Sequence, residues 1–397
     1  MLADRIDEVA ALLRQAGHGC WFLQDFHGQN SIAVRMLGLD PDALATRRAS
    51  VAIHADGTVR TLSHRIETAT LEHWPGERHV YSSYDEYAAG VAALIDGAGS
   101  VCCEYSANGQ NPYLSMLDGG TVDLLRREGE LVESGWLVQH FEARLTTEQV
   151  AQYERSVEIT SEAFRLVESH LRDHLDTGTT EAAVMKVILD HFERLNFDPD
   201  HPPIVGVGPN SGKPHYETGT GSQTTIGRDA VVLVDLWGKV REPGAVFSDF
   251  TRMFYTGPTP PPKVAEVFGV AAAARDGAID LIEGRADGTI AGGLVAGKEP
   301  DQLARAIISE AGYGEAFTHR LGHSITTQLH GSGAHLDGFE IIENRKLVPG
   351  LLFSVEPGIY LPEFGVRTEV NVRIDDNGTP HVYAAGDIQR AITCVHN

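Results

Sequence analysis

Charged and polar side chains interrupt an otherwise small and apolar stretch between residues 319 and 369. The stretch opens with HRLGH at 319–323, closes with GVRTE at 365–369, and carries Glu356 between them. An ionised carboxylate removed from water destabilises the fold unless it is paired with a cation or bound to a metal. The apolar neighbours of Glu356 and Glu369 therefore predict that a cation is bound here. The fold then has to bring the other ligands of that cation to this stretch.

Two aspartates earlier in the chain are candidates for those ligands. Asp235 ends the apolar run 231–234, and Asp249 lies within VFSDFT at 246–251. If residues 238–244 turn the chain back, the two strands pair antiparallel and the aspartates face each other across the hairpin. A cation between two such carboxylates turns their repulsion into chelation. Taken alone, the two aspartates are better explained by Asp235 as a turn cap and by Asp249 as a solvated residue of an edge strand.

A histidine completes the predicted set. His323 is one of 18 histidines, and a lone histidine is usually a core or surface residue. It stands out because His319, Gly322 and His330 lie close to it in sequence and Glu356 follows them. Four carboxylates and one imidazole suit manganese, cobalt or zinc in a two-metal site. The predicted metal ligands are Asp235, Asp249, His323, Glu356 and Glu369.

Arg367 precedes Glu369 by two residues. On a strand, both side chains point to one face, so the arginine is expected to orient the carboxylate from outside the metal site. A plain salt bridge is the alternative interpretation of this pair.

Bulk properties exclude several classes of partner. The formal net charge of −23 argues against nucleic acid and against an anionic membrane surface. Acidic residues stand where a signal peptide has its basic head, and no stretch approaches the roughly 18 apolar residues that cross a bilayer. The four cysteines lack the spacing of a disulfide framework, which favours a reducing compartment. We therefore expect a cytoplasmic protein.

The length of 397 residues suits two domains, at roughly 150 residues per domain. Residues 1–145 alternate helix and strand patterns, as in an α/β layer domain, with a first helix that ends before Gly17. In residues 146–397, Thr146 and Gln149 have the spacing of a capping box at a helix start. The order there is helix, helix, strands, helix, helix, strands, which indicates an α+β domain of two similar halves.

The motifs resemble those of the pita-bread metallopeptidases, which include prolidase, aminopeptidase P and methionine aminopeptidase, with creatinase as a metal-free relative. The matching segments are Asp235, SDFTR at 248–252, HRLGH at 319–323, VEPGIY at 355–360 and GVRTE at 365–369. The amino-terminal region, including residues 23–39, is similar to that of the prolidase, aminopeptidase P and creatinase branch. This resemblance implies a creatinase-like α/β domain at 1–145 and a pita-bread catalytic domain with a pseudo-twofold axis at 146–397.

The resemblance also implies an activity. It predicts a peptidase with two divalent metal ions, of which manganese is preferred and cobalt or zinc is possible. The expected reaction is hydrolysis of the Xaa-Pro bond at the amino terminus of a peptide, with Xaa-Pro dipeptides (prolidase) preferred. An Xaa-Pro aminopeptidase acting on longer peptides is the alternative, and a creatinase-like or lyase-type small-molecule enzyme is the alternative from another class. A homodimer is expected.

Individual roles follow from the same resemblance. Asp235 would chelate one metal, His323 and Glu356 the other, and Asp249 and Glu369 would bridge both. Glu356 would also carry a proton from water to the proline nitrogen.

Four further residues are expected to contact the substrate. His215 would hold it, and His330 would stabilise the oxyanion. His319 would belong to the substrate site. Arg345 occupies the place of an arginine that binds a dipeptide carboxylate, although a solvated charge run is the alternative.

Three departures from the family pattern concern substrate choice. The two aspartates are separated by a slightly long turn at residues 239–245. Ser324 replaces the usual glycine after the histidine ligand, and the loop from Gly331 to Phe339 does not follow the prolidase pattern.

Overall fold

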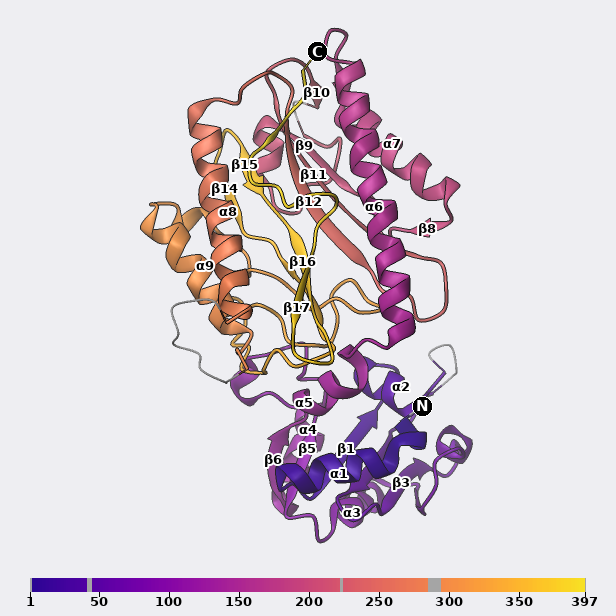
Figure 1. Cartoon of the computed structure of the whole chain (residues 1–397). Coiled ribbons are helices and arrows are strands. Elements are labelled where there is room, and N and C mark those ends of the chain that lie inside the picture. The colour runs from indigo at the N-terminus through magenta and orange to yellow at the C-terminus, as the bar shows by residue number, and fades with distance from the viewer. Residues whose placement is uncertain (1, 41–44, 222–223, 285–293, 397) are drawn as a thin grey trace. The chain divides into compact units, whose positions relative to one another are not determined.

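A computed structural model describes residues 2–40, 45–221, 224–284 and 294–396 (Figure 1). The chain divides into two compact units, Met1–Phe141 and Glu142–Asn397. The sequence predicts this boundary near residue 145.

The amino-terminal unit is built on a six-stranded mixed sheet in the order β4-β3-β2-β1-β5-β6. Its strands β1, β2 and β3 pair antiparallel, and the outer pairs β3–β4, β1–β5 and β5–β6 are parallel. The strands are β1 (Cys20–Asp25), β2 (Ala49–His54), β3 (Val59–His64), β4 (Glu77–Tyr81), β5 (Ser100–Cys103) and β6 (Glu130–Glu133). The helices are α1 (Ile6–Ala16), α2 (Ser31–Leu37), α3 (Tyr84–Ile95), α4 (Gly119–Glu128) and α5 (Gly135–Val138).

The central strand β1 is buried on both faces. Trp21 and Leu23 pack into one hydrophobic cluster, whereas Cys20 and Phe22 pack into another on the opposite face. This alternation is the two-residue period of a strand. As predicted, α1 ends at Gly17, which adopts a φ of 74°. The expected α/β layer arrangement is thereby confirmed.

One carboxylate lies fully inside this unit. Glu104 is 0% exposed, and its oxygens accept hydrogen bonds from Trp21 Nε1 at 3.0 Å, Ser134 Oγ at 3.0 Å and Asn30 Nδ2 at 3.2 Å. Burial raises the pKa of Glu104 to about 7, against the lowering effect of these donors. Both oxygens of this buried carboxylate therefore have partners.

In its described residues, the second unit has four long helices, two sheets and two short strand pairs. Figure 1 shows α6 and α8 on opposite sides of the strands. The helices are α6 (Thr147–Asp173), α7 (Glu181–Arg194), α8 (Pro262–Ile282) and α9 (Lys298–Glu310). The predicted capping box of Thr146 and Gln149 is present at the start of α6.

The longest hairpin of this unit carries the two aspartates. Its strands are β11 (Val231–Val240) and β12 (Ser248–Tyr255), which pair antiparallel as predicted. Asp235 lies opposite Thr251, and Asp249 lies two residues away from Thr251 on the same strand. The aspartates are therefore diagonal neighbours on one face of the hairpin.

The remaining strands complete two sheets and two small pairs. In the first sheet, β12 and β11 lie between β18 and β8, and β9 also pairs with β11. The second sheet has the order β13-β16-β17, and β14 pairs with β15. Their bounds are β7 (Thr179–Thr180), β8 (Phe197–Asp198), β9 (Ile204–Val207), β10 (Thr225–Ile226), β13 (Leu352–Val355), β14 (Gly358–Tyr360), β15 (Gly365–Arg367), β16 (Val370–Ile374), β17 (Pro380–Tyr383) and β18 (Thr393–Cys394).

A search of the described residues for a helix long and apolar enough to cross a membrane finds none.

Candidate metal centre

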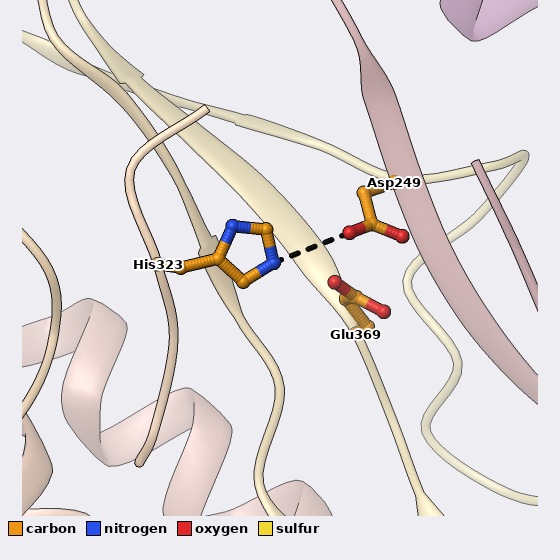
Figure 2. A group of neighbouring side chains, drawn as sticks. All are labelled: Asp249, His323 and Glu369. Atoms are coloured by element: carbon orange, nitrogen blue, oxygen red, sulfur yellow. Dashed lines mark ion pairs between the residues drawn. The ribbon is translucent and has the colours of Figure 1, made fainter. Parts of the chain in front are cut away.

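Three of the predicted ligands meet inside the second unit. Ligand atoms of Asp249, His323 and Glu369 all lie within 4.8 Å of one another, and the three residues are buried. Figure 2 shows their side chains converging, with His323 Nε2 3.3 Å from Asp249 Oδ2. Asp249 comes from β12, His323 from the segment after α9, and Glu369 from the link between β15 and β16. Residues far apart in sequence thus form one cluster.

Glu356 and Asp235 border the same cluster. Glu356 directly follows β13, and its Oε1 is 3.4 Å from His323 Nε2. Burial, with the negative charge of Asp235 as the next cause, raises the pKa of Asp249. The structure therefore brings all five predicted ligands into one region, and their roles as ligands stay predictions.

The imidazole of His323 presents a lone pair to the carboxylates. Burial, followed by the charge of His330, lowers the pKa of His323, so the ring is neutral. Its Nδ1 lies 3.3 Å from the Ser324 carbonyl oxygen and donates to it, since a carbonyl can only accept. Nε2 is then an acceptor beside two carboxylate oxygens. This arrangement is repulsive without a cation between them, and it suits a metal ligand.

The carboxylates of the cluster also lack hydrogen-bond donors at some of their oxygens. Asp235 Oδ1 and Glu369 Oε1 are buried and have no hydrogen-bond partner among the described residues. Burial raises the pKa of both groups, and at Glu369 the charge of Asp249 adds to the rise. Burial also raises the pKa of Glu356 to about 7. Divalent cations would satisfy these oxygens and neutralise their repulsion, so the residues present fit a metal site.

Arg367 holds Asp235 rather than Glu369. Its Nη2 donates to Asp235 Oδ2, and its Nε donates to Thr251 Oγ1 at 3.0 Å. Thr251 in turn donates to Glu369 Oε2 at 2.8 Å. Among the described residues, the hydrogen bonds of Arg367 therefore reach Glu369 through Thr251 and not directly, and β15 ends at Arg367. The predicted role outside the metal site is compatible with this geometry.

His319 is linked to the same arginine. Arg367 Nη1 donates to the Tyr360 hydroxyl at 2.9 Å, and that hydroxyl is 2.7 Å from His319 Nε2. Burial lowers the pKa of His319 to about 3, and the charge of Arg367 adds to this. Its Nδ1 donates to the Arg320 carbonyl oxygen at 2.7 Å, so the neutral ring accepts from Tyr360 at Nε2. The orientation of His319 is thereby fixed.

His330 lies against the cluster. Its ring centroid is 4.3 Å from that of His323 in an edge-on arrangement. It also lines a cavity of about 520 Å³ with Lys239 and Phe247. Lys239 Nζ donates to the Thr327 carbonyl oxygen at 2.6 Å, three residues before His330. The long turn noted in the sequence therefore begins with a residue that anchors the His330 segment.

His215 is exposed. It lies near Asp235, because its charge contributes to lowering the pKa of that residue against the larger effect of burial.

Glu181 is a residue that the sequence did not single out. It is 0% exposed, and its Oε1 accepts from Val207 N at 2.8 Å and Asn210 Nδ2 at 2.9 Å. Its Oε2 accepts from Tyr216 Oη at 2.6 Å. Glu181 therefore fixes the loop that carries His215. A glutamate in the first turn of a helix is ordinarily explained by the helix dipole, so its position gave no signal of this role.

The guanidinium group of Arg345 binds other residues of the protein. Its guanidinium contacts Glu343 at both carboxylate oxygens and donates to the carbonyl oxygens of Ser332 at 2.6 Å and Gly333 at 2.8 Å. Ser324 Oγ accepts from Gly333 N at 3.1 Å. Two departures from the family pattern, Ser324 and the loop at 331–339, are thus parts of one anchored loop. Binding of a substrate carboxylate by Arg345 stays a prediction, which this geometry does not favour.

The buried cluster of two carboxylates and a histidine defines a candidate metal-binding site. A sequence profile of metallopeptidase family M24 matches residues 151–376, more than half of the chain, so the chain belongs to that family. This confirms the resemblance drawn from the motifs.

Individual proteins are also similar. An Xaa-Pro dipeptidase from Lactobacillus delbrueckii subsp. lactis is 32% identical over 260 residues, covering 64% of this chain and 63% of that protein. A dipeptidase, PepE, from Mycobacterium ulcerans has a structure with a TM-score of 0.65 and 22% identity, covering 100% of this chain and 98% of its own. The structure of the X-Pro aminopeptidase of Thermotoga maritima is similar with a TM-score of 0.55 and 20% identity. The match covers 96% of this chain and 99% of that protein's chain. These structures confirm the expected fold.

Proposed function

We propose that the protein is a metal-dependent Xaa-Pro dipeptidase, which releases the residue before a proline at the amino terminus of a dipeptide. One observation carries the proposal: inside the region that matches family M24, buried carboxylate oxygens of Asp235 and Glu369 have no hydrogen-bond partner among the residues that the structure describes. The similar Lactobacillus protein is named an Xaa-Pro dipeptidase, which supports this choice of substrate. The match spans less than two thirds of that protein's length, so its activity is carried over only as a proposal.

The proposed ligands are Asp235, Asp249, His323, Glu356 and Glu369, holding two divalent ions. Manganese is the proposed metal, with cobalt or zinc as substitutes, since carboxylate oxygens dominate the set. When bound, the ions polarise the scissile carbonyl and lower the pKa of water toward neutrality. Asp249 and Glu369, which lie together in Figure 2, are the proposed bridging ligands.

The protein's own residues would move the proton and hold the substrate. Glu356, with a pKa raised to about 7 by burial, is suited to take a proton from water and to return it to the proline nitrogen. His330 beside His323 is the proposed donor to the developing oxyanion. His215, which is exposed, would bind the substrate, and His319 would border it in the orientation that Tyr360 fixes.

An Xaa-Pro aminopeptidase is the second candidate, and one observation favours it. The donors of Arg345 are engaged by Glu343 and by loop carbonyls, so this arginine is poorly placed to select the free carboxylate of a dipeptide. An enzyme without such a selecting cation would accept longer peptides.

The proposed setting is a cytoplasmic homodimer without nucleic-acid or membrane partners. The net charge of −23 supports the exclusion of polyanionic partners.

A comparison of two matched substrates tests the proposal. The purified protein, loaded with Mn²⁺, is given an Xaa-Pro dipeptide and the tripeptide that extends it by one residue. We expect a higher kcat/KM for the dipeptide. A strong preference for the tripeptide would move the assignment to the aminopeptidase, and no cleavage of either would favour a creatinase-like or lyase-type enzyme.

A further inference from the structure

We propose that the amino-terminal unit has a binding site of its own, centred on Arg48, for a small carboxylate with a flat apolar body. Two cavities of about 220 and 200 Å³ share Phe26 and Arg48 in their linings. Every lining residue belongs to the amino-terminal unit, and none is among the residues proposed for catalysis. The site is therefore separate from the proposed peptidase function.

Arg48 is held by aromatic rings and not by an anion. Its guanidinium carbon is 5.3 Å from the ring centroid of Phe26 and 4.9 Å from that of Tyr87. An aromatic ring attracts a guanidinium without accepting its N–H groups in the way an anion does, and a planar guanidinium can bind a carboxylate with two hydrogen bonds.

One donor of Arg48 has no acceptor in the part of the chain that the structure describes. Its Nε is buried there without a hydrogen-bond partner. Buried donors are nearly always satisfied, so a group left open beside a cavity indicates that a ligand supplies the acceptor.

The neighbouring polar groups are already engaged, which leaves Arg48 as the group that selects the ligand. Asp118 accepts from Thr121 N at 3.0 Å and from Thr121 Oγ1 at 2.7 Å, capping α4. Gln24 donates to Thr121 Oγ1 at 2.9 Å and accepts from Ser50 Oγ and Tyr87 Oη. A neutral ligand would gain little from these groups.

The lining of the smaller cavity defines the charge and shape of the ligand. Among the described residues it contains no aspartate or glutamate, and its basic members are Arg47, Arg48 and His64. The backbone N–H groups of Ser82 and Ser83 are bound by Glu86, at 2.7 and 3.3 Å, so they do not form an anion-binding nest for a phosphate. A singly charged carboxylate fits better, and the rings of Phe26, Tyr84 and Tyr87 suit a flat apolar body.

Benzoate is the probe for this site. The metal-loaded full-length chain is titrated calorimetrically with benzoate, with benzamide and acetate as probes that lack the charge or the ring. We expect saturable millimolar binding of benzoate and weaker binding of the other two. Arg48→Gln should weaken benzoate binding by at least about tenfold, since a charge-assisted pair is lost.

Two further variants keep the test decisive. Arg78→Gln removes an exposed arginine of the same unit outside both cavities, and it should leave the affinity unchanged. Phe26→Leu keeps the charge and removes one ring, so it should weaken benzoate more than acetate. Tryptophan fluorescence shows whether each variant is folded.

The metal centre is a competing site for any carboxylate. Benzoate is therefore also titrated into Asp249→Ala, which should retain the Arg48-dependent binding. Absence of benzoate binding to the wild type, or binding that survives Arg48→Gln and disappears in Asp249→Ala, would overturn the proposal.

Discussion

Each unit of the protein buries carboxylates, but the two units differ in how completely hydrogen-bond donors satisfy the carboxylate oxygens. In the amino-terminal unit, Glu104 receives hydrogen bonds from three neutral side chains and is 0% exposed. In the second unit, Asp235 and Glu369 each bury an oxygen without a partner. The first arrangement is complete without a ligand, whereas the second requires a cation. Burial alone therefore does not distinguish the two arrangements, whereas the unpartnered oxygens of Asp235 and Glu369, in a cluster with Asp249 and His323, do.

The largest expected difference between the two units is the effect that substituting a buried carboxylate has on enzymatic activity. Asp249→Ala should lower Xaa-Pro hydrolysis by at least about 10³-fold, because the site loses a principal electrostatic group. Glu104→Gln is the matched control and should retain activity below its unfolding temperature. Steady-state rates of the two variants on an Xaa-Pro dipeptide test this expectation. An active Asp249→Ala preparation would contradict the assignment of a functional role to the carboxylates of the second unit.

Metal removal should destabilise only the second unit. Free metal at about 1,000 times Kd adds about 4 kcal/mol to the free energy of unfolding, which corresponds to about 10 °C in Tm for a domain of this size. Scanning calorimetry with and without a chelator measures the shift. Asp249→Ala should show no such shift, and an equal shift in that variant would mean that the chelator acts elsewhere.

The stability of the amino-terminal unit should depend on the proton of Glu104. Its pKa rises from an ordinary value of 4.5 to about 7 on folding because burial disfavours the charge. The folded state therefore holds this proton to higher pH, so the stabilisation is complete below pH 4.5 and is lost as the pH rises through 7. The free energy of unfolding should fall by about 3 kcal/mol across this window.

Urea unfolding at the two ends of that window, followed by tryptophan fluorescence, measures this loss. Glu104→Gln cannot ionise and should show a flatter pH dependence than the wild type. Identical slopes for the two proteins would show that Glu104 does not titrate there.

The smallest expected effect concerns the loop of His215. Glu181→Gln should lower kcat/KM by about tenfold while the bound metal is retained, since the loop loses acceptors and not a ligand. Asp375→Asn is the control, because Asp375 also fixes a turn of this unit through Asn377 N and Thr379 N. Loss of metal in Glu181→Gln would show instead that this residue supports the centre itself.

The sequence predicted the elements that depend on local pattern. The capping box at Thr146, the end of α1 and the hairpin of Asp235 and Asp249 all follow from spacing within a few residues. The family and its fold followed from five short motifs in order.

What the sequence could not predict depends on distant contacts. Arg367 was expected to hold Glu369, but its guanidinium donates to Asp235. Glu181 reaches a loop more than 25 residues away in sequence, and no local pattern encodes that contact. The hydrogen bonds from Arg345 to Glu343 and to two loop carbonyl oxygens likewise depend on how the loop folds back.

The central claim is that the unpartnered carboxylates of the second unit hold metal. The most direct measurement is a calorimetric titration of the metal-free protein with Mn²⁺. The claim predicts about two ions bound per chain in the wild type and in Glu104→Gln, and a loss of this binding in Asp249→Ala. A wild-type protein that binds no Mn²⁺, or an Asp249→Ala variant that binds it as well as the wild type, would contradict it.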